Sequence, residues 1–177
     1  GGGGSEAVEA IAPARRAVEV LKPGAEAQGA SVALRRTYAA ALTQLGFIEQ
    51  RTGRNEAALA TLQAALDAYR GIDDLKSDTD AAANFGLTSG WLMDALNQAG
   101  RPAEALAVGD EGRRVASQVL ERQPTHMLAL RARALLSSNV ATVSENELQQ
   151  SRRFAASEDA ARDWMLLSRT DPTNVIT

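Results

Sequence analysis

The sequence contains no cysteine and few aromatic residues. Of its 177 residues, 4% are Phe, Trp or Tyr, whereas 45% are hydrophobic, most of them Ala, Leu and Val. The absence of Cys excludes thiol catalysis, disulfide bonds and thiolate metal sites. A hydrophobic composition dominated by Ala and Leu favours close packing of helices and provides few of the residues typical of a β-sheet. We therefore expect an all-α protein.

Clusters of one charge sign and long apolar runs are also missing. The 19 Lys and Arg and the 22 Asp and Glu are interspersed and give a formal net charge of −3. Nucleic-acid binding needs clustered cations that displace counterions from phosphate, so no nucleic-acid partner is expected. No apolar run approaches the roughly 18 residues of a membrane span, and no basic-then-apolar export signal opens the chain. We expect no membrane insertion and a cytoplasmic location.

Groups suited to catalysis or metal binding are scattered. His126 is the only histidine and is expected to be an exposed residue in the first turn of a helix, because a zinc site needs three or four converging ligands. An acidic segment lacks the Gly and the terminal Glu of a calcium loop and is explained more simply by the dipole of the helix that follows. This segment contains Asp73, Asp74, Asp78 and Asp80. We expect no enzyme activity, no metal and no cofactor.

Paired arginines and two tryptophans have ordinary structural interpretations. Adjacent residues on a helix point about 100° apart, so Arg35-Arg36, Arg113-Arg114 and Arg152-Arg153 are expected on solvated faces rather than in an anion site. Trp91 and Trp164 have apolar neighbours at helical spacing, which favours packing between helices.

The chain opens with four glycines and a serine. Such a segment cannot form a core, so residues 1–5 are expected to be a flexible, engineered linker. We assign residues 6–174 to a single helical repeat domain and residues 175–177 to a tail.

Turn markers recur at near-regular intervals. A Gly-Arg dipeptide followed by a helix start occurs at Gly53 and again at Gly100, 47 residues later. Each Gly is expected to end a helix in the left-handed conformation. Pro124 and Pro172, 48 residues apart, mark a second kind of helix junction, and Pro23 resembles a further junction of this kind. The pattern indicates a solenoid of helix pairs. The helices are expected near residues 6–21, 31–51, 55–70, 79–99, 102–122, 126–142 and 145–169.

Small residues and capping pairs refine these helices. A stripe of small residues, which contains Gly109 and Gly112, predicts a close helix crossing, because Gly inside a helix costs up to about 1 kcal/mol relative to Ala. Ser77 and Ser144, each followed three residues later by an acid, are expected to cap helix starts.

These residues carry a family resemblance. Leu42, Leu45, Gly46, Gly53, Ala58, Leu62 and Ala65 fall at the spacings of the tetratricopeptide-repeat motif, and Leu92, Leu96, Gly100, Ala105 and Leu106 repeat part of it. The spacing of 47 to 48 residues exceeds the family's usual unit of about 34. Long units that begin with a stretch such as Ala33-Leu34-Arg35-Arg36 resemble the repeat tails of bacterial multidomain signalling proteins. The resemblance implies a right-handed α-solenoid of about seven helices in antiparallel pairs.

The resemblance also implies a binding surface. In the family, the first helices of successive pairs line a concave groove that binds an extended or helical peptide. Carrying the motif phase onto this chain gives a candidate set of groove residues. They are Thr43, Phe47, Gln50, Arg51, Asp94, Asn97, Gln98, Arg131, Ser138 and Asn139. The basic and Asn residues with which some members clamp a C-terminal carboxylate are missing, so a receptor for chaperone tails is not expected.

We therefore expect a protein-protein interaction scaffold, the regulatory part of a larger bacterial signalling protein. Its partner would be a peptide or protein, including a domain of the same parent protein. Two alternatives remain open. The first is a structural spacer or oligomerisation module that forms a homodimer through its repeat ends. The second is a sensor that binds a small molecule between repeats.

Overall fold

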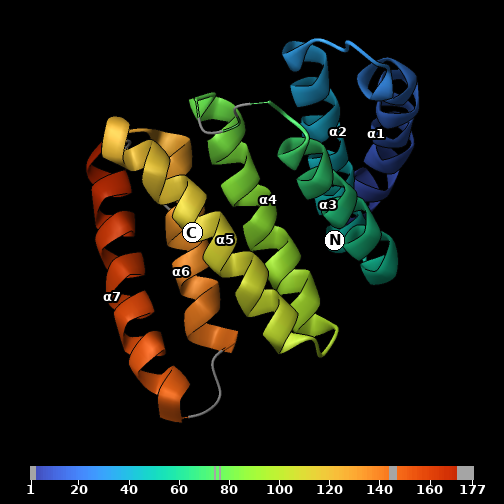
Figure 1. Cartoon of the computed structure of the whole chain (residues 1–177). Coiled ribbons are helices and arrows are strands. Elements are labelled where there is room, and N and C mark those ends of the chain that lie inside the picture. The colour runs from blue at the N-terminus through green and yellow to red at the C-terminus, as the bar shows by residue number, and fades with distance from the viewer. Residues whose placement is uncertain (1–2, 74, 76, 144–146, 171–177) are drawn as a thin grey trace. The chain divides into compact units, whose positions relative to one another are not determined.

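The computed structural model describes residues 3–73, 75, 77–143 and 147–170. These residues form helices and turns, and no strand occurs among them, which confirms the all-α prediction. The seven helices are α1 (Gly3–Glu26), α2 (Val32–Arg51), α3 (Asn55–Arg70), α4 (Thr79–Gln98), α5 (Pro102–Arg122), α6 (Met127–Val143) and α7 (Glu147–Thr170) (Figure 1). The four helices from α2 to α5 begin and end within one residue of their predicted positions.

The first helix is longer than predicted. It was expected to end before Pro23, but α1 includes both Pro13 and Pro23 and ends at Glu26. Proline inside a helix costs about 3 kcal/mol because it removes a backbone hydrogen bond. Within the last turn, Ala25 is buried, at 6% exposed, and belongs to a core cluster with residues of α2 and α3, which favours continuation of the helix past Pro23. The helix also begins at Gly3, so residues 3–5, expected in a linker, belong to α1.

Local signals set the other helix ends. Gly53 and Gly100 have φ angles of 75° and 73°, which confirms that both adopt the left-handed conformation predicted for them. The prediction that Ser77 caps α4 is wrong: Asp78 is the N-cap, and its Oδ1 accepts a hydrogen bond of 3.0 Å from the amide of Ala81. A carboxylate at this position also interacts favourably with the positive end of the helix dipole. Ser144 lies outside the described residues.

The chain divides into two compact units, residues 1–75 and 76–177, which are described separately. The prediction of one continuous repeat domain over residues 6–174 stays a prediction. In unit 1, α2 packs against both α1 and α3. Tyr38 and Leu42 of α2 form a core with Ala25 of α1 and Ala65 of α3. Unit 1 is therefore a three-helix assembly centred on α2.

One acidic side chain is buried in unit 1. The carboxylate of Glu49, with its side chain 3% exposed, accepts a hydrogen bond of 3.2 Å from Nη2 of Arg15 and one of 2.7 Å from Oγ1 of Thr61. These partners belong to α1 and α3. Hydrogen bonds to both carboxylate oxygens offset the cost of removing the charge from water. Glu49 thereby links all three helices.

Unit 2 contains α4, α5, α6 and α7. Helix α4 packs against α5 and α6, and α6 packs against α5 and α7. The largest fully buried side chains of this unit include Phe85, Leu92 and Met93 of α4 and Leu130 and Leu136 of α6. The core of unit 2 therefore lies where α4 and α6 meet their neighbours.

Glycines allow the helices of unit 2 to approach closely. A Cβ placed on Gly112 of α5 would lie 2.8 Å from Oγ of Ser89 in α4, and one on Gly109 would lie 2.6 Å from Sδ of Met93. A Cβ on Gly90 would lie 2.7 Å from Cδ2 of Leu135 in α6. These distances are shorter than real Cβ contacts, so the close crossing predicted from the small-residue stripe is confirmed.

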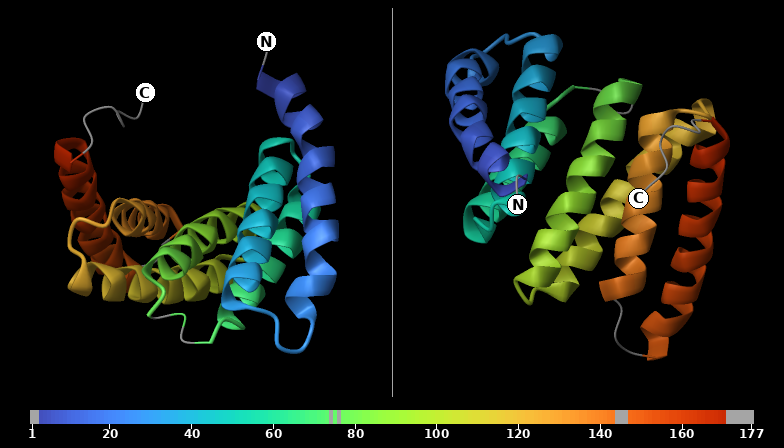
Figure 2. Two further views of the ribbon diagram at one scale, coloured as in Figure 1. Left: turned by 90° about the horizontal axis from the view of Figure 1, so that it is seen from above. Right: turned by 180° about the vertical axis from the view of Figure 1, so that it is seen from behind.

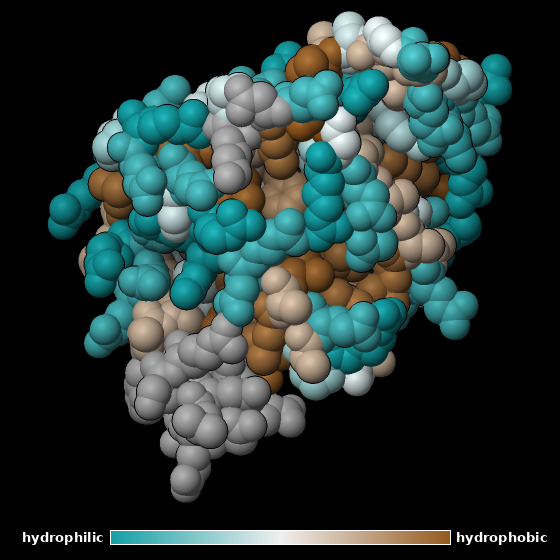
Figure 3. Space-filling view, in the orientation of Figure 1, coloured by the Kyte–Doolittle hydropathy of each residue, from teal (hydrophilic) through white to brown (hydrophobic). Residues whose placement is uncertain are grey.

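Large apolar side chains are rarely exposed in the described part of the chain. The exposed ones are Val20, Val32 and Met165. Figure 3 shows one face of the molecule, on which the outermost side chains are mainly hydrophilic and hydrophobic ones lie deeper between them. Isolated exposed apolar residues are normal on a protein surface and do not by themselves mark a binding site.

Candidate functional site

The predicted groove residues of unit 1 all lie on α2. Thr43 is 7% exposed, and its hydroxyl donates a hydrogen bond of 2.9 Å to the backbone carbonyl of Ala39. It was expected on a binding surface, and the structure instead buries it. The reason is that α2 is covered on two sides, by α1 and by α3, which leaves a narrower solvent-facing sector than a helix with one neighbour would have.

The other three residues of this set are more accessible. Phe47 and Gln50 are partly buried, and Arg51 is exposed. The guanidinium carbon of Arg51 lies 5.7 Å from the centre of the Phe47 ring. A cation at this distance from an aromatic face is attracted by the ring quadrupole, worth about 0.5 to 1 kcal/mol at exposed sites. In unit 1, the candidate surface is therefore reduced to Phe47, Gln50 and Arg51.

In unit 2, the predicted residues occupy two helices that pack against each other. The α4/α6 face is defined here as Asp94, Asn97 and Gln98 of α4 with Arg131, Ser138 and Asn139 of α6. Gln98 and Arg131 are exposed, and the other four residues are partly buried. The right-hand view of Figure 2 shows these two helices side by side from behind. The structure therefore brings residues about 40 positions apart in sequence onto neighbouring helices.

Four side chains of the α4/α6 face make hydrogen bonds within the protein. The amide nitrogen Nδ2 of Asn139 donates a bond of 3.0 Å to the backbone carbonyl of Gly90, which joins α6 to α4. Nε2 of Gln98 donates a bond of 2.8 Å to Oδ2 of Asp94. The Ser138 hydroxyl accepts a long bond of 3.4 Å from the indole of Trp164 in α7. Bonds of this kind restrict the rotamers of these side chains.

Both tryptophans are partly buried, as the prediction of packing between helices requires. Trp91 lies on α4 and Trp164 on α7. Because the indole of Trp164 reaches Ser138, this side chain also positions a residue of the α4/α6 face.

His126 is placed differently from the prediction. It was expected to be exposed, but its side chain is 13% exposed and both ring nitrogens are engaged. Nδ1 accepts a hydrogen bond of 3.3 Å from the amide of Ala129, so Nε2 carries the proton and points to Oδ1 of Asp80 at 3.3 Å. The imidazole occupies the position of an N-cap side chain for α6 and also contacts Asp80 of α4. With both nitrogens occupied, it is not a free general base.

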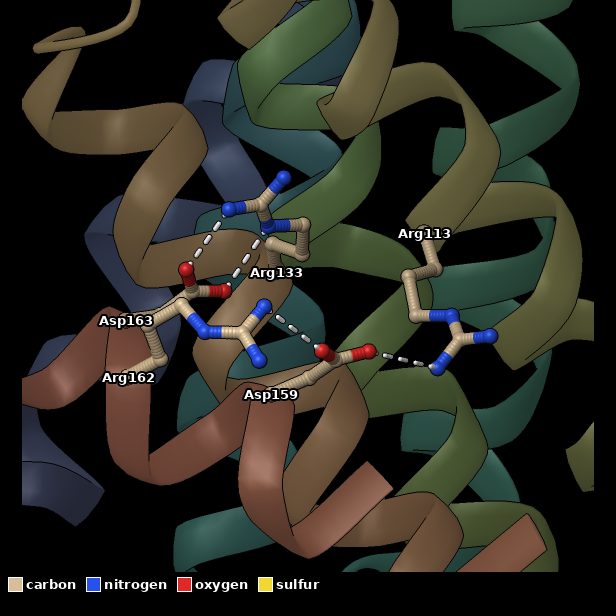
Figure 4. Close-up of polar contacts among 5 residues, drawn as sticks. All are labelled: Arg113, Arg133, Asp159, Arg162 and Asp163. Carbon is tan, nitrogen blue, oxygen red and sulfur yellow. Dashed lines mark hydrogen bonds and ion pairs between the residues drawn. The ribbon is translucent and has the colours of Figure 1, made fainter. Parts of the chain in front are cut away.

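Sequence reasoning did not find an ionic network between α5, α6 and α7 (Figure 4). The buried carboxylate of Asp163 accepts two hydrogen bonds from Arg133, of 2.8 Å from Nε and 2.6 Å from Nη2. These bonds raise the pKa of the Arg133 guanidinium above its ordinary value. Asp159 lies near Arg162 at 3.2 Å and Arg113 at 3.8 Å. Both carboxylate oxygens of Asp163 have a hydrogen-bond donor, which indicates that this residue helps to hold α7 against α6. The sequence offers no signal that an acid on this helix is buried.

No group of three or more His, Asp or Glu among the described residues is arranged to hold a metal ion. In the same part of the chain, none of the helices has both the length and the apolarity that crossing a bilayer requires.

Comparisons with known proteins leave the family open. The chain matches no protein-family model, no curated protein and no solved structure.

Proposed function

We propose that unit 2 is a protein-binding module of the helical-repeat type, in which the α4/α6 face holds an extended or helical peptide. We further propose that α4 with α5, and α6 with α7, are antiparallel pairs that stack as two units of a right-handed solenoid similar to tetratricopeptide repeats. This function is that of a scaffold rather than an enzyme.

The packing pattern of unit 2 is the observation that carries the proposal. Each helix of this unit packs against the next one in the chain, and α4 and α6 pack against each other although α5 lies between them in sequence. Stacked helix pairs produce this pattern, since the first helix of one pair covers the first helix of the next. The two first helices then share one surface that is free of the second helices, and repeat proteins bind partners on such surfaces.

The side chains of the α4/α6 face suit recognition of a peptide. Asn139 is held by the carbonyl of Gly90 and Gln98 by Asp94, so two amide groups are preorganised on the face, and Arg131 supplies an exposed cation elsewhere on α6. Amides supply both donors and acceptors for a peptide backbone, and the guanidinium suits an acidic side chain. We therefore propose that the preferred peptides carry an acidic residue opposite Arg131.

The experiment selects binders without knowledge of the natural partner. A library of random peptides displayed on phage is selected against the full chain, and the enriched peptides are synthesised and titrated by calorimetry. Two charge reversals are compared. Arg131→Glu changes the α4/α6 face, whereas Arg114→Glu changes an exposed residue of α5 and serves as the matched control.

The expected result is that Arg131→Glu weakens binding of the selected peptides at least about tenfold, which corresponds to about 1.4 kcal/mol. Arg114→Glu should leave the affinity unchanged. Equal affinity of the selected peptides for both variants, or a selection that enriches no peptide, would contradict the proposal. Circular dichroism of each variant verifies that the helices are intact.

A further inference from the structure

A cleft of about 510 Å³ lies between the three helices of unit 1. Its lining includes three alanines, Ala25 of α1 and Ala64 and Ala68 of α3, whose short side chains leave the space open. Small-molecule sites typically have volumes of about 300 to 1,000 Å³. The cleft therefore has room for a ligand of metabolite size, and it is separate from the α4/α6 face of unit 2.

The base of the cleft is part of a packed core. Ala25 and Tyr38, which line the cleft, belong to the hydrophobic cluster that also contains Leu42 and Ala65. Tyr38 is 8% exposed and Ala25 6% exposed. Side chains locked in this way keep their positions when a ligand binds, which lowers the entropic cost of binding.

The charged residues of the cleft have both signs. The cations are Lys22 and Arg35, and the acids are Glu26 and Asp67. Nζ of Lys22 lies 3.9 Å from Oε1 of Glu26, and both side chains are more than half exposed. A pair this long and this exposed is weak, so each partner is available to a ligand at little cost.

The guanidinium of Arg35 is held in place at the cleft. Its Nη1 donates a hydrogen bond of 2.9 Å to the backbone carbonyl of Gly71, which fixes the guanidinium against the end of α3. Its Nε is inaccessible to solvent and has no hydrogen-bond partner among the described residues. A carboxylate in the cleft would therefore interact with the positively charged guanidinium of Arg35, which lines the cleft, without reaching the buried Nε.

Tyr38 adds a neutral donor to the same cleft. Burial raises the pKa of its phenol above the ordinary value, and the nearby Glu26 carboxylate raises it further. The hydroxyl therefore stays protonated at physiological pH and is available to donate a hydrogen bond.

We propose that this cleft binds a small zwitterion of amino-acid size. The acidic group of the ligand would meet Arg35 and Lys22. Its ammonium group would meet Glu26 and Oδ2 of Asp67, since Oδ1 of Asp67 already accepts a hydrogen bond of 2.8 Å from Nη1 of Arg70. Two cations and two acids sum to no net charge. A ligand with only a positive or only a negative charge would be repelled by the two lining residues that carry the same charge. This repulsion disfavours binding of simple acids and simple amines.

The proposal is tested by calorimetric titration of the full chain with free amino acids and dipeptides. An alkyl amine and an alkyl carboxylate of matched length serve as one-sided probes. Ala64→Leu fills the cleft without removing a charge, and Ala60→Leu places the same side chain on an exposed position of α3 that does not line the cleft. Melting temperatures of both variants close to that of the wild type verify that neither substitution unfolds unit 1.

At least one zwitterion should bind with a Kd below about 1 mM, and both one-sided probes should bind at least about tenfold more weakly. Ala64→Leu and Arg35→Met should each weaken the zwitterion about tenfold or more, whereas Ala60→Leu should not. The proposal is overturned if no zwitterion in the panel binds, if a one-sided probe binds equally well, or if Ala64→Leu has no effect. Peptide binding by the α4/α6 face should be the same in Ala64→Leu and wild type, so failure of one proposal leaves the other standing.

Discussion

Arg133 of α6 holds the carboxylate of Asp163 in α7 through two hydrogen bonds, of 2.8 Å from Nε and 2.6 Å from Nη2, at a position where the Asp163 side chain is 2% exposed. The planar guanidinium and the carboxylate match each other in geometry, which gives directional bonds as well as charge neutralisation. α7 is therefore docked on α6 by an ion pair that water does not reach on its acidic side.

Removing only one partner of this pair should be costly. Arg133→Met leaves an unpaired carboxylate in the interior, and we expect a loss of about 3 to 5 kcal/mol in the free energy of unfolding of unit 2. The double variant Arg133→Met with Asp163→Leu should lose less, because no charge remains buried. Urea denaturation followed by circular dichroism measures both.

The exposed pair Arg101 and Glu104 provides the control. It has the same two-bond geometry, with both distances 2.7 Å, but its side chains are 49% and 58% exposed. Arg101→Met should therefore change the stability little, because water and salt screen the pair. An equal loss for Arg101→Met and Arg133→Met would show that burial is not the cause.

Gly112 should not tolerate even one methyl group. A Cβ at this position would lie 2.8 Å from Oγ of Ser89, and Ser89 Cβ is nearer still. We expect Gly112→Ala to cost about 1 to 3 kcal/mol through overpacking of α4 against α5. Thermal and urea unfolding of the variant measure the cost.

A second substitution tests the steric explanation. Ser89→Gly in the Gly112→Ala background moves the small residue to the other helix and should restore most of the lost stability. Gly71→Ala is the matched control, since a Cβ there meets its nearest atom at 3.5 Å. Failure of the exchanged pair to recover stability would indicate that Gly112 matters for another reason.

His126 should contribute to stability as a cap. His126→Ala removes the acceptor for the amide of Ala129, and the expected loss is about 0.5 to 2 kcal/mol. His126→Asn should recover much of this loss, because the Asn side-chain oxygen is among the best N-cap acceptors. If Asn behaves like Ala, the contribution of His126 comes from Asp80 and from packing instead. Urea denaturation of the three proteins distinguishes these cases.

Tyr38 should make unit 1 sensitive to alkaline pH. Its pKa is raised in the folded state by burial and by Glu26, so folding favours the protonated phenol. The resulting stability is fully present below the unfolded value of about 10 and is lost as pH rises through the folded pKa. Tyr38→Phe should remove this part of the alkaline loss of stability and have no such effect at neutral pH.

A spectroscopic titration checks the direction of the shift. In a Tyr69→Phe background, Tyr38 is the remaining tyrosine of the two in the chain, and its phenolate absorbance reports its ionisation. Glu26→Gln should lower the pKa of Tyr38 by removing the second cause of the shift. A Tyr38 that titrates at or below the ordinary tyrosine value would contradict the prediction.

The sequence by itself determined the secondary structure, because its signals are local. Gly53 and Gly100 mark helix ends through a backbone conformation that other residues avoid, and the small residues at Gly109 and Gly112 mark a close crossing. Tertiary structure decided where α1 ends and which side chains of α2 are buried, because these depend on contacts between helices. Packing of Ala25 carries α1 past Pro23, and the neighbours of α2 bury Thr43.

The charged groups show the same division. The sequence placed Arg133, Asp163, His126 and Asp80 on or beside helices but could not pair them, since each pair is separated by at least 30 residues. Whether a charge lies in water or in the interior depends on which helices cover it, and that depends on the packing of the whole unit. For the α4/α6 face, the sequence provided only a set of candidate positions. The hydrogen bond from Asn139 to Gly90 forms because folding brings α4 and α6 together.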